Sequence, residues 1–114
     1  MRLSEENIRH IKEKEIISLD NHKMIVRINV SDPSEKFWTD DELNYNIYCV
    51  DRDYQIIWQV SKKEKSPYSI DGDEDPFCYL GKNDQGEIIA DRYSGFEYQI
   101  DPETGDVKCI GFHK

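Results

Sequence analysis

The fold is decided by residues 76–114, which read PFCYLGKNDQGEIIADRYSGFEYQIDPETGDVKCIGFHK. Short apolar and aromatic runs alternate in this stretch with clusters of turn-forming residues, and each cluster contains a glycine. This alternation is typical of β-strands joined by tight turns. The stretch therefore predicts four antiparallel strands connected by three turns.

The turns of this stretch have a specific chemistry. Residues 83–86 (NDQG) and 101–105 (DPETG) both suit a type I turn followed by a residue at positive φ, a conformation that glycine adopts without a Cβ clash. Ser94 and Gly95 predict a third, tighter reversal. Both longer turns are therefore expected to close β-hairpins.

The last hairpin has a register that is consistent along its length. Pairing Ile100 with Val107 brings the apolar side chains of both strands to one face of the sheet. The same register sets two further pairs, Tyr98 with Cys109 and Phe96 with Gly111.

Upstream of this stretch the sequence predicts one short helix. Ser4 is a good N-cap for a helix over roughly residues 5–14, and Leu3 and Ile8 have the spacing of a hydrophobic staple. The apolar stripe of this helix is narrow, so we expect it to pack on the sheet or its edge.

A first β-hairpin is predicted over residues 17–30. With residues 20–23 as its loop, Leu19 pairs with Met24. This register places the apolar residues on one face: Ile17, Leu19, Met24, Val26, Ile28 and Val30. A long connection follows over residues 31–43, in which Thr39 is a candidate cap for one helical turn.

A second β-hairpin is predicted over residues 44–60, with its turn at Arg52 and Asp53. One face is then wholly apolar, through the pairs Tyr45 with Val60, Ile47 with Trp58 and Cys49 with Ile56. The other face is a mixed surface of Asn46, Tyr48, Gln55, Ile57 and Gln59. A second long connection, residues 61–76, leads to the C-terminal strands.

These elements together predict a mainly β (α+β) fold. We expect one antiparallel β-meander sheet of about seven or eight strands, open or partly rolled, with a short N-terminal helix. The expected core comprises Val26, Ile28, Ile47, Trp58, Leu80, Ile89, Tyr98, Ile100 and Val107.

Length and charge restrict the class of protein. A chain of 114 residues suits one small domain, residues 1–114. Its net charge of −9 disfavours nucleic acid, whose phosphates require clustered Lys and Arg, and favours a basic protein partner. No apolar run suits a secretory signal or a bilayer span, so we expect a cytoplasmic protein with no membrane partner.

The sequence offers no motif for catalysis or for a cofactor. Asp71, Asp73 and Asp75 alternate as in a calcium-binding loop, but Pro76 and Lys82 stand where that loop needs Gly and Glu. No spacing of His and Cys suits zinc, and no nucleophile motif is present. We therefore expect a protein that is not an enzyme and that needs no metal or cofactor.

Three cysteines, Cys49, Cys78 and Cys109, are odd in number and lack CxxC spacing. Each lies within an apolar strand, which predicts reduced, buried thiols that react slowly.

The predicted partner-binding surface lies at one end of the sheet. In a meander, the two long connections, the turn at Ser94 and Gly95 and the tail after Phe112 meet at one end, with Gly86 and Gly105 at the other. Aromatic residues among acids suit a binding hot spot. The candidate residues are Trp38, Asp40, Asp41, Glu42, Tyr68, Asp71, Asp73, Glu74 and Asp75.

The size, the acidity and the sheet with acidic loops and a closing strand pair, GFEYQIDPETGDVKCIGFHK, resemble the immunity proteins of bacterial toxin–immunity pairs. The resemblance implies a cytoplasmic protein that binds a toxin domain, often a basic nuclease, and occludes its active site or substrate path. Two alternatives stay open: a structural or adaptor subunit of a protein complex, and a small-ligand-binding β-domain. A neighbouring toxin gene, co-purifying subunits or a bound ligand would distinguish the three.

Overall fold

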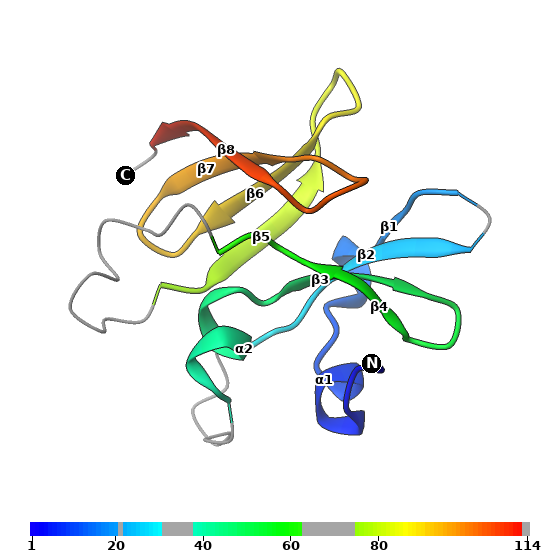
Figure 1. Cartoon of the computed structure of the whole chain (residues 1–114). Helices are drawn as coiled ribbons and strands as arrows, with labels where there is room; N and C mark the ends of the chain where they lie inside the picture. The colour runs from blue at the N-terminus through cyan, green and yellow to red at the C-terminus, as the bar shows by residue number, and fades with distance from the viewer. Residues whose placement is uncertain (21, 31–37, 63–74, 113–114) are drawn as a thin grey trace.

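The computed structural model describes residues 1–20, 22–30, 38–62 and 75–112 and has a mainly β architecture (Figure 1). The described strands form two antiparallel four-stranded sheets, each a simple meander. The first sheet contains β1 (Ile17–Ser18), β2 (Lys23–Arg27), β3 (Ile47–Asp51) and β4 (Ile56–Gln59). The second contains β5 (Phe77–Lys82), β6 (Ile88–Arg92), β7 (Phe96–Ile100) and β8 (Val107–Phe112).

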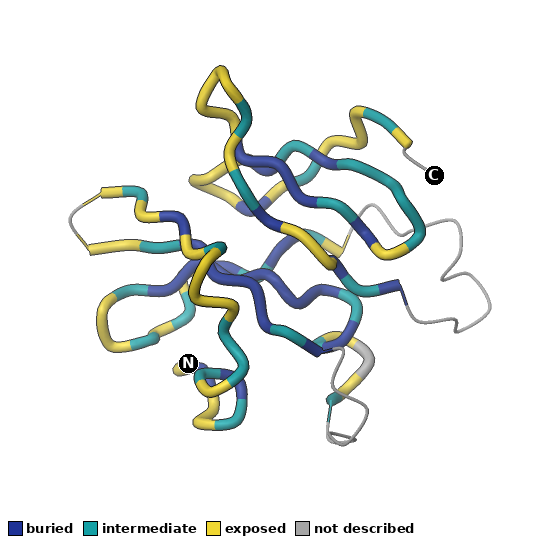
Figure 2. Tube along the Cα trace, turned by 180° about the vertical axis from the view of Figure 1, so that it is seen from behind, coloured by how far each residue is buried: buried dark blue, intermediate teal, exposed yellow. Residues whose placement is uncertain are grey.

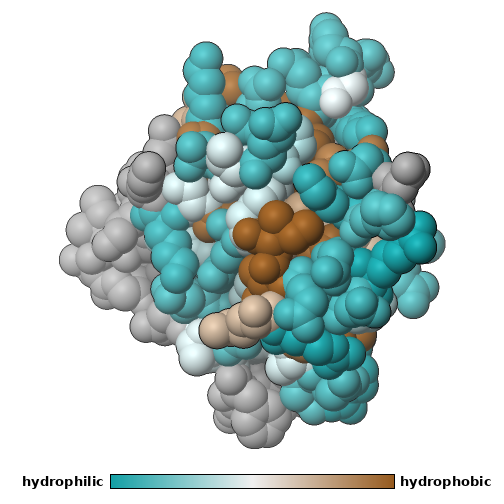
Figure 3. All heavy atoms as spheres, turned by 45° about the vertical axis from the view of Figure 1, so that its right-hand side comes forward, coloured by the Kyte–Doolittle hydropathy of each residue, from teal (hydrophilic) through white to brown (hydrophobic). Residues whose placement is uncertain are grey.

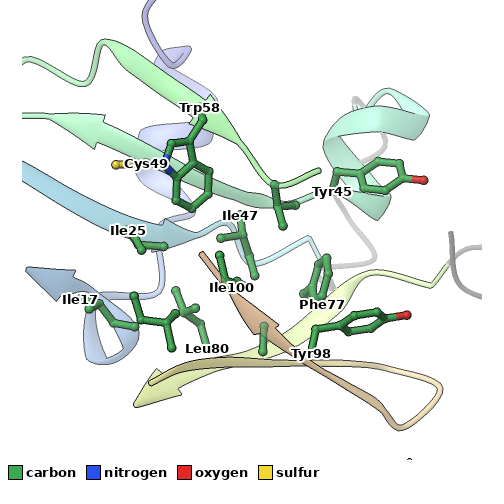
Figure 4. Packing of buried hydrophobic residues seen from close by; sticks show 13 residues of the cluster. Ile17, Ile25, Tyr45, Ile47, Cys49, Trp58, Phe77, Leu80, Tyr98 and Ile100 are labelled. Carbon is green, nitrogen blue, oxygen red and sulfur yellow. The ribbon is translucent and has the colours of Figure 1, made fainter. Parts of the chain in front are cut away.

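The prediction of a mainly β fold is confirmed, whereas the prediction of one continuous sheet is wrong. β4 and β5 do not pair, and the two sheets instead stack with their apolar faces together (Figure 4). Stacking buries one face of each sheet, which a single open sheet does not achieve. The buried members of this inter-sheet core are Ile17, Ile25, Tyr45, Ile47, Cys49, Trp58, Val60, Phe77, Leu80, Ile88, Ala90, Tyr98 and Ile100.

The first sheet also has a second apolar cluster on its other face. Its buried members are Leu3, Val26, Ile28, Val30, Leu43, Tyr48 and Val50. Ile17 pairs with Ile25 and Ser18 with Met24, one residue away from the predicted register. Because a one-residue slip moves side chains to the opposite face, the predicted single apolar face of the first hairpin is divided between the two clusters.

The second hairpin kept its predicted apolar face. Cys49 pairs with Trp58, a shift of two residues from the prediction, and a two-residue shift preserves the face. An irregularity between Cys49 and Val50 places Ile56 in the second cluster, opposite to the prediction. The face predicted as mixed contains the buried residues Asn46 and Tyr48.

The second sheet follows the predicted strands and turns closely. Ile100 pairs with Val107 and Tyr98 with Cys109, whereas a bulge pairs Phe96 with Phe112 instead of Gly111. All three turn glycines have positive φ: Gly86, Gly95 and Gly105. All predicted core residues are buried except Val107, which is half-buried and packs against the inter-sheet core.

In the described part of the chain, two short α-helices and one 3-10 helix accompany the sheets: α1 (Glu5–Arg9), η1 (Glu13–Glu15) and α2 (Asp40–Asn44). Ser4 caps α1 as predicted, but the helix ends well before residue 14. It ends early because Ile11 bridges to Ile28 and the Lys12 N–H donates to the Arg27 carbonyl, which draws the chain along β2. No helix in the described part of the chain is long and apolar enough to span a membrane.

Two buried polar groups tie the sheets together. The Arg27 Nε and Nη2 atoms donate to Glu15 Oε2 at 3.0 and 2.7 Å, and Glu15 Oε1 accepts from the Leu80 N–H at 2.8 Å. Asn46 Nδ2 donates to the carbonyls of Ile28 and Phe77, while its Oδ1 accepts from the Phe77 N–H. β5 is thereby fixed beside β2 through hydrogen bonds as well as apolar packing.

Candidate partner-binding surface

The described ends of the two long connections and the β6–β7 turn lie close together. Lys62 Nζ lies 2.6 Å from Asp41 Oδ2, which joins the end of the second hairpin to α2. The Asp75 N–H donates to Asn44 Oδ1 at 2.8 Å, and the Asp75 carboxylate accepts from Ser94. These contacts agree with the predicted convergence for residues 41–44, 62, 75 and 94, whereas most of the rest of the two connections and the tail after Phe112 lie outside the described residues.

The placement of the β7–β8 turn differs from the prediction. Trp58 Nε1 donates to the Pro102 carbonyl at 3.0 Å, and the Ser61 N–H donates to the Gly105 carbonyl at 2.9 Å. The turn therefore lies against the end of β4 instead of at the end of the molecule away from residues 61–76. The cause is the stacking of two sheets, which a single-sheet meander does not include.

Trp38 lies between the two helical segments, half-buried. Its ring makes an edge contact with the His10 ring at a centroid distance of 5.2 Å, and it packs against the second apolar cluster. Thr39 caps α2 in a full capping box with Glu42, so the prediction of Thr39 as the cap of one helical turn is confirmed.

The described acids of the predicted surface are engaged within the protein. Glu42 accepts hydrogen bonds from the Thr39 N–H and from Asn7 Nδ2. Asp41 is exposed and forms its ion pair with Lys62. Asp40 is the first residue of α2. The remaining candidates lie outside the described residues: Tyr68, Asp71, Asp73 and Glu74. They include most of the acidic run that was compared with a calcium-binding loop.

Asp75 has a structural position that its sequence did not indicate. Its side chain is only 2% exposed, and the carboxylate accepts from the Ser94 N–H at 2.9 Å and from Ser94 Oγ at 2.7 Å. Asp75 is thus buried, and its charge is used to hold the β6–β7 turn. We do not include it in the surface available to a partner.

Buried Arg92 explains why residue 75 is held so firmly. Its Nη1 donates to the carbonyls of Asp75 and Asn44. Its guanidinium carbon lies 4.2 Å from the Phe77 ring centroid, with Tyr45 and Tyr98 also close. Burial raises the pKa of Tyr98 despite the nearby arginine, so the phenol stays neutral at ordinary pH. Arg92 and the three aromatic rings around it therefore belong to the interior of the protein and not to its surface.

Residues 75–112 carry more of the negative charge than their length suggests. They contain eight acidic and three basic residues, a net charge of −5, whereas the longer segment 1–62 has a net charge of −3. The turn acids Asp84, Glu103 and Asp106 are all exposed. The excess of acids in residues 75–112 can be counted from the sequence, but the prediction placed the binding surface on the two long connections instead.

The strand β8 is the most exposed strand of the second sheet. Its residues are exposed or half-buried throughout, and Ile110 and Phe112 are each 44% exposed (Figure 2). In the space-filling view of Figure 3 the surface is largely hydrophilic, with one larger apolar group near the centre and smaller apolar areas toward the top and right. The sequence did not identify β8 as a candidate binding surface, because the apolar residues of this strand were expected to lie in the core.

A hollow of about 370 Å³ lies at the start of β8, over the β7–β8 turn. Its lining combines two carboxylates and one lysine with apolar and polar side chains: Gln99, Ile100, Asp101, Pro102, Asp106, Val107 and Lys108. The hollow is thus shared by residues of the β7–β8 turn and by the first residues of β8. Carboxylates in such a position favour a basic side chain as occupant.

All three cysteines are free, as predicted, but the prediction of burial is wrong for two of them. Cys49 is fully buried in the inter-sheet core, but Cys78 and Cys109 are exposed. Desolvation raises the pKa of both Cys49 and Cys78. Within the described ranges, no group of three or more His, Cys, Asp and Glu residues is placed to hold a metal ion.

The chain belongs to a family described as a domain of unknown function, DUF7957, whose family model matches residues 8–112. The match extends from α1 to the last residue of β8, so it includes both sheets. No curated protein and no solved structure matches the chain.

Proposed function

We propose that this protein is a non-catalytic module that binds a basic protein partner, and that it acts in the bacterial cytoplasm as the immunity protein of a toxin domain. The observation that carries the proposal is the net charge of −5 on residues 75–112. A surface of this charge attracts a basic protein and speeds its association. A nuclease toxin fits, because it needs basic residues to bind phosphates.

The exposed apolar residues of β8 supply the second part of a binding surface. Ile110 and Phe112 are exposed on a strand that begins directly after the acids Glu103 and Asp106. Apolar residues surrounded by polar ones are typical of protein interfaces. Charge would speed the encounter, and apolar contacts would slow dissociation.

The proposal is tested by co-expression with the protein encoded by the neighbouring gene. We expect that protein to be toxic alone, to lose its toxicity when this chain is present, and to form a stable complex with it. Continued toxicity together with separate elution of the two proteins in size-exclusion chromatography would overturn the proposal.

A charge-reversal pair tests the surface itself. The double variant Glu103→Lys and Asp106→Lys should slow association at low salt by about tenfold or more, since it reverses two exposed acids. The matched control is Glu13→Lys with Asp53→Lys, which makes the same change in net charge at exposed positions outside the second sheet. An equal effect of both variants would show that only net charge matters.

A further inference from the structure

The edge of β8 offers unpaired backbone groups. β8 pairs with β7 on one side, and no strand among the described residues pairs with it on the other side. Two other outer strands are less open: residues 1–3 pair with residues 54–56 at the start of β4, and Glu15 accepts from the β5 backbone, while β1 has only two residues. An open strand edge is a template for another strand.

The hydrogen-bond pattern identifies which groups face outward. The Asp101 N–H donates to the Asp106 carbonyl at 2.8 Å, so residue 106 faces β7. Residues of an antiparallel strand alternate between facing the neighbouring strand and facing away from it. Val107 and Cys109 therefore direct their N–H and C=O groups away from β7. The bulge between Glu97 and Tyr98 in the β7–β8 pairing ends this regular section near Ile110.

The acidic residues near the edge of β8 favour a positively charged segment as its binding partner. The hollow at the start of β8 is lined by the Asp101 and Asp106 carboxylates and by Lys108, and Glu103 is exposed on the same turn, so three acids stand against one lysine. A second copy of β8 would bring the same excess of acids to this edge, which like-charge repulsion opposes. A segment with lysine or arginine would instead place its cations among these carboxylates.

We propose that β8 binds an extended, basic segment of a protein partner by antiparallel or parallel strand addition at Val107 and Cys109, with a basic side chain in the hollow of Asp101 and Asp106. This inference rests on the proposed function and specifies how the partner is held. Backbone hydrogen bonds supply the affinity, and the hollow supplies the selection for positive charge.

The probe is a capped eight-residue peptide of alternating lysine and isoleucine, titrated into the full chain at low salt by calorimetry. We expect it to bind, and we expect a peptide of the same composition with N-methyl groups on alternate backbone nitrogens to bind at least about tenfold more weakly. The N-methyl peptide leaves the protein unchanged, so its result does not depend on the folding of a variant.

On the protein side, Cys109→Pro removes an outward N–H without removing a ladder hydrogen bond, because proline is tolerated where the N–H faces solvent. The control Cys109→Val keeps the N–H. We expect the proline variant to weaken binding by about tenfold or more and the valine variant to leave it within about twofold.

The outcomes separate the two proposals. If the charge reversal Glu103→Lys with Asp106→Lys weakens binding while N-methylation and Cys109→Pro do not, strand addition is overturned and the acidic surface stands. If the peptide does not bind, or if no variant changes its binding, strand addition at β8 is overturned, while the proposed function is decided separately by co-expression with the neighbouring gene's product. A peptide of alternating glutamate and isoleucine that binds equally well would overturn the selection for positive charge.

Discussion

The two sheets have the same meander order but opposite surroundings. The first sheet is buried on both faces, by the inter-sheet core on one side and by the second apolar cluster on the other. The second sheet shares the inter-sheet core, while its last strand remains exposed. The difference indicates that the first sheet serves mainly as a scaffold, and that the second sheet holds the surface available to a partner.

The largest loss of stability is expected when the contact of Trp58 between the two sheets is removed. Trp58 lies in β4, and its indole contacts the β7–β8 turn. Trp58→Ala should lower the free energy of unfolding by about 3–5 kcal/mol, measured by urea denaturation. Ile110→Ala, at an exposed position of β8 in the second sheet, is the control, with an expected loss below about 1 kcal/mol. Equal losses would contradict the division into scaffold and open edge.

The buried ion pair should have the next largest effect. Glu15→Ala leaves the Arg27 guanidinium buried and unpaired, and it removes the acceptor for the Leu80 N–H. We expect a loss of about 3–5 kcal/mol in the free energy of unfolding. The exposed pair of Glu5 with Arg2 is the control, and Glu5→Ala should cost less than about 1 kcal/mol. A loss at Glu15 as small as that at Glu5 would show that this pair does not hold the sheets together.

Two turn glycines separate backbone strain from close contact. Gly86 and Gly105 have the same φ of 79°, but a Cβ at residue 105 would lie 2.5 Å from Trp58 Cε3, while a Cβ at residue 86 meets nothing within 4 Å. Gly86→Ala should cost about 1–2 kcal/mol from strain alone. Gly105→Ala should cost at least about 1 kcal/mol more, by thermal denaturation. Identical melting temperatures would argue against a tight contact between this turn and Trp58.

The rate of thiol labelling compares the buried core between the sheets with the exposed strand β8. In variants that each retain one cysteine, Cys109 should react with a disulfide reagent much faster than Cys49, because Cys49 is inside the inter-sheet core. Cys78 is exposed, but the raised pKa of its thiol should slow its reaction at neutral pH. Rapid labelling of Cys49 in the folded protein would mean that the core between the sheets opens readily.

Local sequence signals predicted the second sheet well. The glycine turns and the pairs of Ile100 with Val107 and Tyr98 with Cys109 are set by residues close in the chain, so turn chemistry determines the register. The bulge that pairs Phe96 with Phe112 was not predicted, although Gly111, which pairs with Glu97 next to it, is the kind of residue that often marks a bulge within a strand.

Long-range packing explains what the sequence did not predict. Alternation shows that a strand has an apolar face, but it does not show whether that face meets a helix or another sheet. The stacking of β5 on β2 depends on Asn46 and Glu15, whose partners lie far along the chain. The burial of Asp75 depends on Ser94 and Arg92 in the same way.

The most direct test of the open edge is amide hydrogen exchange on β8, measured by nuclear magnetic resonance with and without a saturating amount of the lysine–isoleucine peptide. The account predicts that the amides of Val107 and Cys109 exchange rapidly in the free protein and at least about tenfold more slowly in the complex, while the amide of Lys108, which faces β7, is protected in both. Unchanged exchange at Val107 and Cys109 in the saturated complex would contradict it.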